Sequence, residues 1–174
     1  HDALPIWRNE AAFGELELLP RPLDGTRVRD QSVSLFGKRL ALPVLVGPTG
    51  LSGLLWPDGE LATARAAARA GTVYCLSHGS TCTIEQLAAG GAGLRWMQVF
   101  MYRDRELTRA FAERALTAGY DALVLTTDNQ VLGNRERDLR NGFTIPPRFT
   151  GATMLGMLSR TPWLWRMRGR RDLT

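Results

Sequence analysis

The chain has 174 residues, of which 44% are hydrophobic and 22% charged, and its formal net charge is +5. These proportions are typical of a globular domain and exclude a disordered chain, and no apolar run reaches the ~20 residues of a membrane-spanning helix. The basic residues are nearly all arginines that gather near the C-terminus. This clustering favours a local interaction site or a solvated surface over nucleic-acid binding.

The first half of the chain predicts a β-hairpin, a strand and a helix. SVSLF (32–36) and RLALP (39–43) flank a Gly37–Lys38 turn, and the apolar run PVLVG follows at 43–47. Residues 57–71, PDGELATARAAARAG, predict a helix in which Asp58 can cap, the alanine-rich body favours helix and Gly71 ends it.

From residue 72 onwards, short apolar strands alternate with amphipathic helices. We expect strands at 72–77, 94–100 and 121–127, a short helix from Thr83 to 91, and a helix at 104–119 capped near Asp104. The order β-α-β-α-β-α-β predicts right-handed βαβ units and a parallel sheet.

Polar residues just after the strands distinguish between the two common parallel folds. No G-x-G-x-x-G follows the first strand and no P-loop is present, so the signatures of the open nucleotide-binding sheets are missing. In a (β/α)₈ barrel, by contrast, polar residues gather after each strand. Such residues are Pro48, Thr49, Ser77, Gln98, Thr126 and Asp128. The sequence therefore predicts an α/β fold of the (β/α)₈ TIM-barrel type.

Four strands cannot close such a barrel, which takes eight strands and typically ~250 residues. We interpret residues 1–174 as the N-terminal half of one barrel domain, with the other half on a further segment. Residues 1–42 form an N-terminal segment and hairpin, 43–128 carry strands one to four with their helices, and 129–174 form an active-site loop and a variable segment.

The strand-end motifs carry a family resemblance. They are GPTG (47–50), LS (76–77), WMQVF (96–100), LTTDN (125–129) and NRERDLRNGF (134–143), joined by LLPRPLDG (18–25) and WPDGELATARAAARAG (56–71). In this order they resemble the FMN-dependent 2-hydroxy-acid oxidoreductases, the family of glycolate and lactate oxidases and mandelate dehydrogenase. The resemblance runs from about Trp7 to Phe143, and the mandelate dehydrogenase branch is the most similar.

The resemblance implies FMN as cofactor and a 2-hydroxy acid as substrate. The FMN contacts that it implies are Pro48, Thr49, Gly50, Ser77, Gln98 and Thr126. Hydroxyl, amide and backbone groups suit this task, because a flavin ring needs donors and acceptors around its polar edge. Taken singly, each of these residues could equally satisfy a strand end.

Two charged residues are given roles by the same resemblance. Asp128 resembles the carboxylate that orients a base histidine, which would lie outside this chain, and Arg135 resembles the arginine that binds the substrate carboxylate. Alternatively, Asp128 caps a loop, and Glu136 and Arg137 tie Arg135 into a surface salt-bridge network. His78 is expected to be a structural histidine, because no acid or second ligand near it in sequence supports catalysis or metal binding.

Three positions depart from the common family pattern. Phe100 replaces a tyrosine that contacts substrate, so either Tyr102 or a water substitutes for that phenol, or the substrate and rate differ from the common pattern. Gly50 replaces the alanine of many oxidases, which disfavours O₂ as the main acceptor. Gly79 stands where small-acid oxidases of the family often carry a bulky aromatic residue, and it leaves room for a mandelate-like or bulkier substrate.

The sequence leaves other functional interpretations open. Another FMN barrel, such as type 2 isopentenyl-diphosphate isomerase, or a catalytically silent flavin- or partner-binding relative, would share much of this pattern. Cys75 and Cys82 have no spacing that indicates a metal site or disulfide, no metal is expected, and HDALPIW is not a signal peptide, so we expect a cytoplasmic protein. The resemblance also implies a tetramer.

The segment GATMLGMLSRTPWLWRMRGRRDLT (151–174) predicts an apolar helical patch, a break at Pro162, and tryptophans beside arginines. Tryptophan next to basic residues suits the headgroup boundary of a membrane, so peripheral contact with the inner face of the membrane is one expectation. The alternative is a loop that packs its tryptophans on a neighbouring subunit or over the active site.

Overall fold

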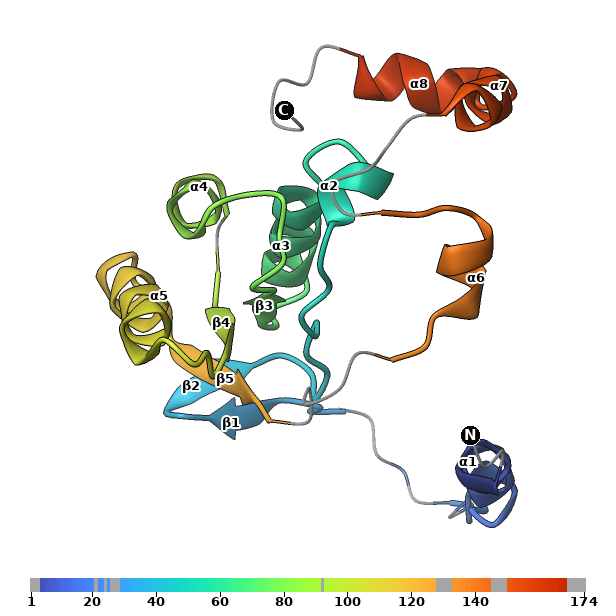
Figure 1. Cartoon of the computed structure of the whole chain (residues 1–174). Helices are drawn as coiled ribbons and strands as arrows, with labels where there is room; N and C mark the ends of the chain where they lie inside the picture. The colour runs from blue at the N-terminus through green and yellow to red at the C-terminus, as the bar shows by residue number, and fades with distance from the viewer. Residues whose placement is uncertain are drawn as a thin grey trace. The chain divides into compact units, whose positions relative to one another are not determined.

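The computed structural model describes residues 4–20, 22–23, 25, 29–91, 93–127, 133–144 and 150–168, with the side chains of 4–6 and 152 left out. The chain divides into two compact units, His1–Asp30 and Gln31–Thr174. Figure 1 shows its helices and strands.

The first unit contains one described helix, α1, from Leu4 to Gly14. Its side chains Trp7 and Phe13 are exposed. Helix α1 was not predicted from the sequence.

The second unit begins with the predicted hairpin, which the structure confirms. Strand β1 (Val33–Leu35) pairs antiparallel with β2 (Lys38–Leu40). The turn lies at Phe36 and Gly37, one residue earlier than predicted, and both residues have positive φ, 48° and 73°. Two adjacent positive φ angles are what a two-residue hairpin turn requires.

A three-stranded parallel sheet forms the centre of this unit. Strands β3 (Tyr74–Leu76), β4 (Arg95–Phe100) and β5 (Ala122–Thr126) lie in the order β3-β4-β5. The strand expected at 43–47 is reduced to one parallel bridge between Val46 and Tyr74. Prolines 43 and 48 have no N–H to donate at either end of this segment, so only its middle joins the ladder.

Four helices connect these strands: α2 (Ser52–Leu55), α3 (Gly59–Arg69), α4 (Ile84–Gly90) and α5 (Arg105–Thr117). Thr83 forms a capping box with Gln86 at the start of α4. Asp104 accepts from two N–H groups at α5, where a cap was predicted. The capping role expected of Asp58 is wrong. This residue stands at the N-cap of α3 in the left-handed region and its side chain makes no cap hydrogen bond.

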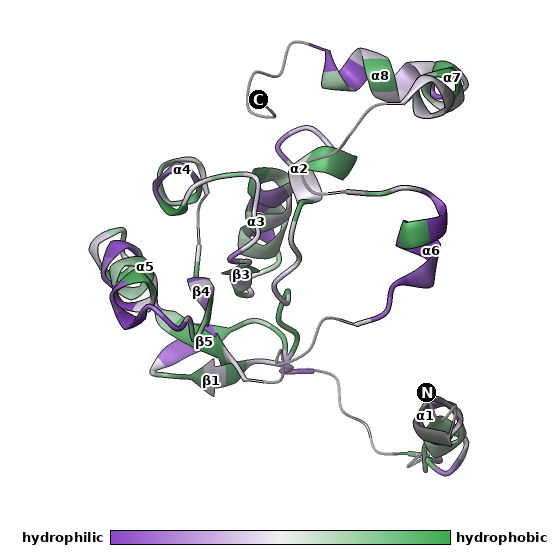
Figure 2. Cartoon of the chain, viewed as in Figure 1, coloured by the Kyte–Doolittle hydropathy of each residue, from purple (hydrophilic) through white to green (hydrophobic). Residues whose placement is uncertain are grey.

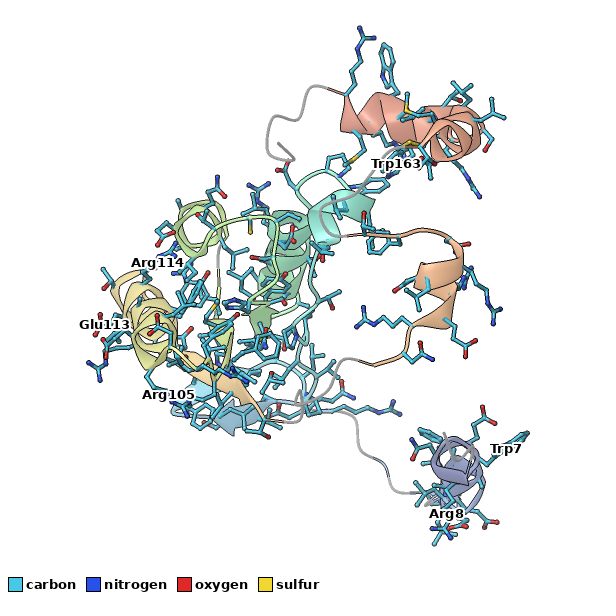
Figure 3. The ribbon with its side chains drawn as sticks, in the orientation of Figure 1. Trp7, Arg8, Arg105, Glu113, Arg114 and Trp163 are labelled. Carbon is cyan, nitrogen blue, oxygen red and sulfur yellow. The ribbon has the colours of Figure 1, made fainter. Side chains whose placement is uncertain are left out.

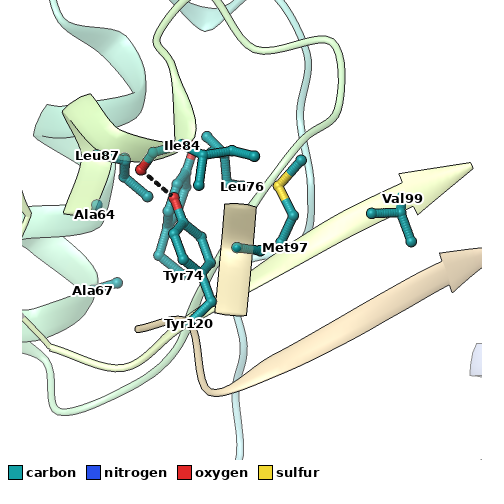
Figure 4. Packing of buried hydrophobic residues seen from close by; sticks show 10 residues of the cluster. Ala64, Ala67, Tyr74, Leu76, Ile84, Leu87, Met97, Val99 and Tyr120 are labelled. Carbon is teal, nitrogen blue, oxygen red and sulfur yellow. Dashed lines mark hydrogen bonds between the residues drawn. The ribbon is translucent and has the colours of Figure 1, made fainter. Parts of the chain in front are cut away.

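The hydrophobic core lies between the sheet and helices α3, α4 and α5 (Figure 4). Strand side chains alternate between faces, so Met97 and Val99 point to this core while Trp96, Gln98 and Phe100 share the opposite face. Phe36 of the hairpin contacts Trp96 on that opposite face, with ring centroids 5.5 Å apart. The helices thus cover one face of the sheet, and the polar strand ends belong to the other.

Three short helices follow β5: α6 (Glu136–Arg140), α7 (Gly151–Leu158) and α8 (Thr161–Met167). Figure 2 shows polar colouring over most of α6 and apolar stretches in α7 and α8. Pro162 lies in the first turn of α8, so the chain breaks between α7 and α8 as predicted, whereas α6 was expected to be loop. Among the described residues, no helix combines the length and apolar character needed to cross a membrane.

Candidate functional site

A row of hydrogen bonds joins the carboxyl ends of the three parallel strands. Ser77 follows β3, Gln98 belongs to β4 and Thr126 ends β5. The strand register therefore brings all three residues together at the end of the sheet where the parallel strands finish. The Gln98 amide donates from Nε2 to Thr126 Oγ1 at 2.9 Å. Its Oε1 accepts from Ser77 Oγ at 3.5 Å and from the backbone N–H of His78 at 2.8 Å. The structure therefore brings together three of the side chains that the sequence singled out.

Two side chains of this hydrogen-bonded row are buried, which holds them in place. Gln98 is 3% exposed and Ser77 is 8% exposed, so both polar groups need protein partners, and the row supplies them. The Thr126 hydroxyl accepts from Gln98, which leaves its own hydrogen available for a ligand. Thr126 lines an open pocket of about 790 Å³ together with Phe100, Leu125 and Thr127. The strand ends thus present an ordered polar group to a space that a ligand can enter.

The turn that carries Pro48, Thr49 and Gly50 lies against Gly79. The N–H of Leu51 donates to the Gly79 carbonyl at 2.9 Å. A Cβ atom at Gly50 would come within 3.1 Å of that carbonyl oxygen, so an alanine here would require the Gly79 backbone to shift by a few tenths of an ångström. Gly79 in turn donates its N–H to Ser77 Oγ at 3.2 Å, which links the turn to the polar row.

Glu60 forms hydrogen bonds with both segments, the one after the Pro48–Gly50 turn and the one after Gly79. The sequence did not reveal this role. Its side chain is 1% exposed, and Oε1 accepts from the N–H groups of Ser52 and Thr81 at 3.1 and 2.9 Å. Its Oε2 accepts from Thr81 Oγ1 at 2.7 Å. In the sequence Glu60 is only an acid in the first turn of a helix, and no local signal indicates that it is buried.

The remaining predicted residues lie elsewhere or outside the described part. Arg135 is exposed at the start of α6 and lines a separate pocket of about 310 Å³ with Asn134 and Asp138. Among the described residues of this region, the salt bridge joins Glu136 to Arg140 at 2.6 Å and does not include Arg135. Asp128 lies outside the described residues, so its predicted role stays a prediction.

Both cysteines are free thiols. Burial raises the pKa of Cys75, and that of Cys82, to about 11, so neither is a ready thiolate nucleophile near neutral pH. Among the described residues no group of three His, Cys, Asp or Glu side chains could hold a metal ion.

Comparison with known proteins identifies relatives of the chain. The family model described as FMN-dependent dehydrogenase matches residues 2–174. The chain is 45% identical over 150 residues to L-lactate oxidase of Nostoc sp., covering 84% of this chain and 41% of that enzyme. It is 38% identical over 149 residues to glycolate oxidase 1 of Zea mays, covering 86% of this chain and 40% of that enzyme.

A solved structure of a monotopic membrane protein, (S)-mandelate dehydrogenase, superposes with a TM-score of 0.86 at 38% identity. The match covers 95% of this chain and 44% of that one. The chain thus spans less than half the length of these relatives. Together with the parallel sheet and its helical layer, this similarity confirms the predicted fold as part of a TIM barrel.

Proposed function

The chain belongs to the family of FMN-dependent dehydrogenases, and we propose that the whole protein oxidises an L-2-hydroxy acid to the 2-oxo acid with FMN as the hydride acceptor. The observation that carries this proposal is the hydrogen-bonded row of Ser77, Gln98 and Thr126 at the open end of the sheet. In this proposal the rest of the barrel is supplied by a further segment, which also carries the base histidine.

The groups at the strand ends fit the polar edge of a flavin ring. The Gln98 amide fixes the Thr126 hydroxyl as a donor, and Pro48, Thr49 and Gly50 are exposed in the turn that follows the Val46 bridge. Flavin needs such donors and acceptors at fixed positions, because they tune its acceptance of hydride. We therefore assign Pro48, Thr49, Gly50, Ser77, Gln98 and Thr126 to the FMN site.

The substrate side of the reaction is assigned to three other positions. Arg135, whose planar guanidinium suits bidentate pairing, would bind the substrate carboxylate. Asp128 would orient the base histidine, which takes the proton of the substrate hydroxyl while the hydrogen on C2 leaves as hydride. Phe100 would form an apolar wall, because its half-buried ring lines the same pocket as Thr126.

The lack of a side chain at Gly79 is evidence for a substrate with a bulky side chain. It is exposed, and a Cβ added there would meet only Ser77 Oγ, at 3.9 Å. We propose that this space admits an aromatic or long apolar group, so that mandelate-like acids are preferred over glycolate. In this proposal Gly79→Trp reverses the preference, measured as the ratio of kcat/KM for mandelate and glycolate.

The central test is flavin reduction in the intact protein. Purified protein should bind FMN, and the flavin should bleach when a 2-hydroxy acid is added without oxygen. Gln98→Ala and Thr126→Ala should weaken FMN binding or shift its spectrum, and Asp128→Asn should slow bleaching with FMN retained. An intact protein that takes up no FMN would refute the proposal.

Assembly and location are part of the same proposal. We propose a tetramer of whole chains, with α7 and α8 in peripheral contact with an anionic membrane on the cytoplasmic side. Exposed apolar residues support this contact: Met154, Leu155, Leu158 and Trp165. Arg166 and Arg168, also exposed, lie in or beside α8 and could meet anionic headgroups.

A further inference from the structure

His78 lies at the centre of a cluster of aromatic rings at the end of β3. Its ring centroid is 4.4 Å from that of Phe111 on α5, 5.2 Å from Tyr102 and 5.7 Å from Phe100. The Tyr102 hydroxyl forms a hydrogen bond with His78 Nε2. This bond crosses from the segment after β4 to the segment after β3, so it joins two loops at the strand ends.

The surroundings of Nδ1, the ring nitrogen that does not bond to Tyr102, indicate which tautomer His78 adopts. Nδ1 is buried and has no hydrogen-bond partner among the described residues. A buried N–H without a partner is rarer in proteins than an unpaired acceptor, which assigns the hydrogen to Nε2 and makes His78 the donor to Tyr102. Burial also lowers the pKa of His78, in agreement with a neutral ring.

Hydrogen bonds of the backbone hold Tyr102 in place for its bond with His78. Its N–H donates to Thr108 Oγ1 at 3.1 Å, and the Thr108 hydroxyl donates to the Phe100 carbonyl at 3.3 Å. Thr108 belongs to α5, whose Ala115 is fully buried in the core. The backbone of Tyr102 is therefore held by α5 of the helical layer, and its phenol forms the hydrogen bond with His78.

The backbone of His78 connects this cluster to the polar row. Its N–H donates to Gln98 Oε1, and the next residue, Gly79, donates its N–H to Ser77 Oγ. The Gly79 carbonyl then accepts from the N–H of Leu51. Two hydrogen bonds, Tyr102 to the His78 ring and Leu51 to the Gly79 carbonyl, are thus joined by the covalent backbone of His78 and Gly79, which links Tyr102 to the Pro48–Leu51 turn.

We propose that His78 and Tyr102 are a positioning pair, whose hydrogen bond holds the Ser77–Gly79 segment and, through Gly79, the Pro48–Leu51 turn. The pair does not touch the reacting atoms in this proposal. Its effect on the flavin rests on the proposed function, whereas its effect on the backbone of Leu51 does not.

The test compares Tyr102→Phe with Tyr120→Phe in the intact protein. Both changes remove only a phenol oxygen, and Tyr120 donates instead to the Ile84 carbonyl, at 3.0 Å, in the helical layer (Figure 4). The Leu51 amide should exchange its hydrogen about fivefold faster in Tyr102→Phe, the size expected for one net hydrogen bond. It should be unchanged in Tyr120→Phe. Equal protection of Leu51 in Tyr102→Phe and the unmodified protein would overturn the proposal.

Two variants of His78 test its part in the hydrogen bond with Tyr102. His78→Gln keeps an N–H donor and should preserve Leu51 protection, whereas His78→Leu should match Tyr102→Phe. Because the two residues share one bond, the double variant should be no worse than either single change. Additive effects on Leu51 exchange would argue against a pair, and Tyr102→Phe still decides if His78→Leu fails to fold.

The flavin gives the functional readout. With FMN bound, Tyr102→Phe should shift the flavin absorption and raise KM about fivefold, with a smaller change in kcat. Tyr120→Phe should lower stability without either effect. If the unmodified protein binds no FMN, the proposed function fails, but Leu51 exchange still tests the pair. If it binds FMN and Tyr102→Phe changes neither absorption nor KM, the link from the pair to the flavin is wrong.

Discussion

The β3-α4-β4-α5-β5 region and the α6–α8 region use apolar residues in opposite ways. In the first, the side chains of Leu76 and Leu87 are 0% and 1% exposed and meet in one core. In the second, Leu139 and Leu155 are each 72% exposed. Both regions have apolar residues at helical spacing, so spacing alone does not decide burial.

The difference comes from what each helix has to pack against. Helices α4 and α5 lie on a sheet whose strands are hydrogen-bonded in register. Helix α8 is held to the α2 region by isolated contacts, of which Trp163 Nε1 donating to the Leu55 carbonyl at 3.0 Å is one (Figure 3). Arg166 over the ring of Trp56, 4.8 Å from its centroid, is another. A surface held in this way leaves apolar side chains free for a partner or a membrane.

The largest expected effect is a difference in the free energy of unfolding between leucine substitutions in the two regions. Leu87→Ala should lower the free energy of unfolding by about 2–5 kcal/mol, because it opens a cavity in the core. Leu155→Ala, also in a helix, should change it by less than about 0.5 kcal/mol. Urea denaturation of the intact protein measures both. Equal losses would mean that α7 is covered in solution.

Two glutamates give the next comparison. Glu60→Gln should cost about 1–3 kcal/mol, because the buried carboxylate accepts three hydrogen bonds and an amide cannot accept all of them. Glu136→Gln removes the exposed pair with Arg140 in α6 and should cost less than about 1 kcal/mol. Thermal unfolding of the two variants checks the order, and a larger loss for Glu136→Gln would contradict it.

A smaller effect concerns the stability of the sheet region in acid. Two hydrogen bonds of 2.9 Å from Arg114 on α5 lower the pKa of Glu85 on α4 from 4.5 to about 2. A lowered folded-state pKa stabilises the fold above pH ~4.5, and this contribution disappears as pH falls towards 2. Glu85→Gln should flatten the dependence of unfolding free energy on pH in this window, and Arg114→Gln should do the same. An unchanged slope in both variants would show that the pair does not persist in solution.

The smallest expected effect concerns membrane contact in the α7–α8 region. Trp165 is 73% exposed, whereas Trp163 is half-buried and bonded to Leu55. Trp165→Ser should therefore weaken sedimentation of the intact protein with anionic vesicles at low salt, and added salt should weaken it further. Trp163→Ser serves as the matched change at a covered ring. Equal recovery in the supernatant with and without vesicles would leave α8 as a packing element.

The sequence predicted features whose causes are local. The cap at Asp104 depends on neighbours two or three residues away and is confirmed, as is the short helix expected from Thr83. The gathering of Ser77, Gln98 and Thr126 at the strand ends was also predicted, because parallel strands place their carboxyl ends together, but the hydrogen bonds among them were not. Glu60 and Trp163 were missed or left undecided, because their partners lie elsewhere in the chain: Trp163 and Leu55 are 108 positions apart. The FMN and substrate roles, including that of Asp128, stay predictions.

The close approach of Gly50 to Gly79 has a consequence for laboratory evolution of substrate range. A methyl group at residue 50 would push on the Gly79 carbonyl, 3.1 Å away, and so move the backbone that any new side chain at residue 79 depends on. Substitutions at the two positions should therefore be epistatic rather than additive. A library that varies residues 50 and 79 together will reach pocket shapes that two separate single-site libraries cannot.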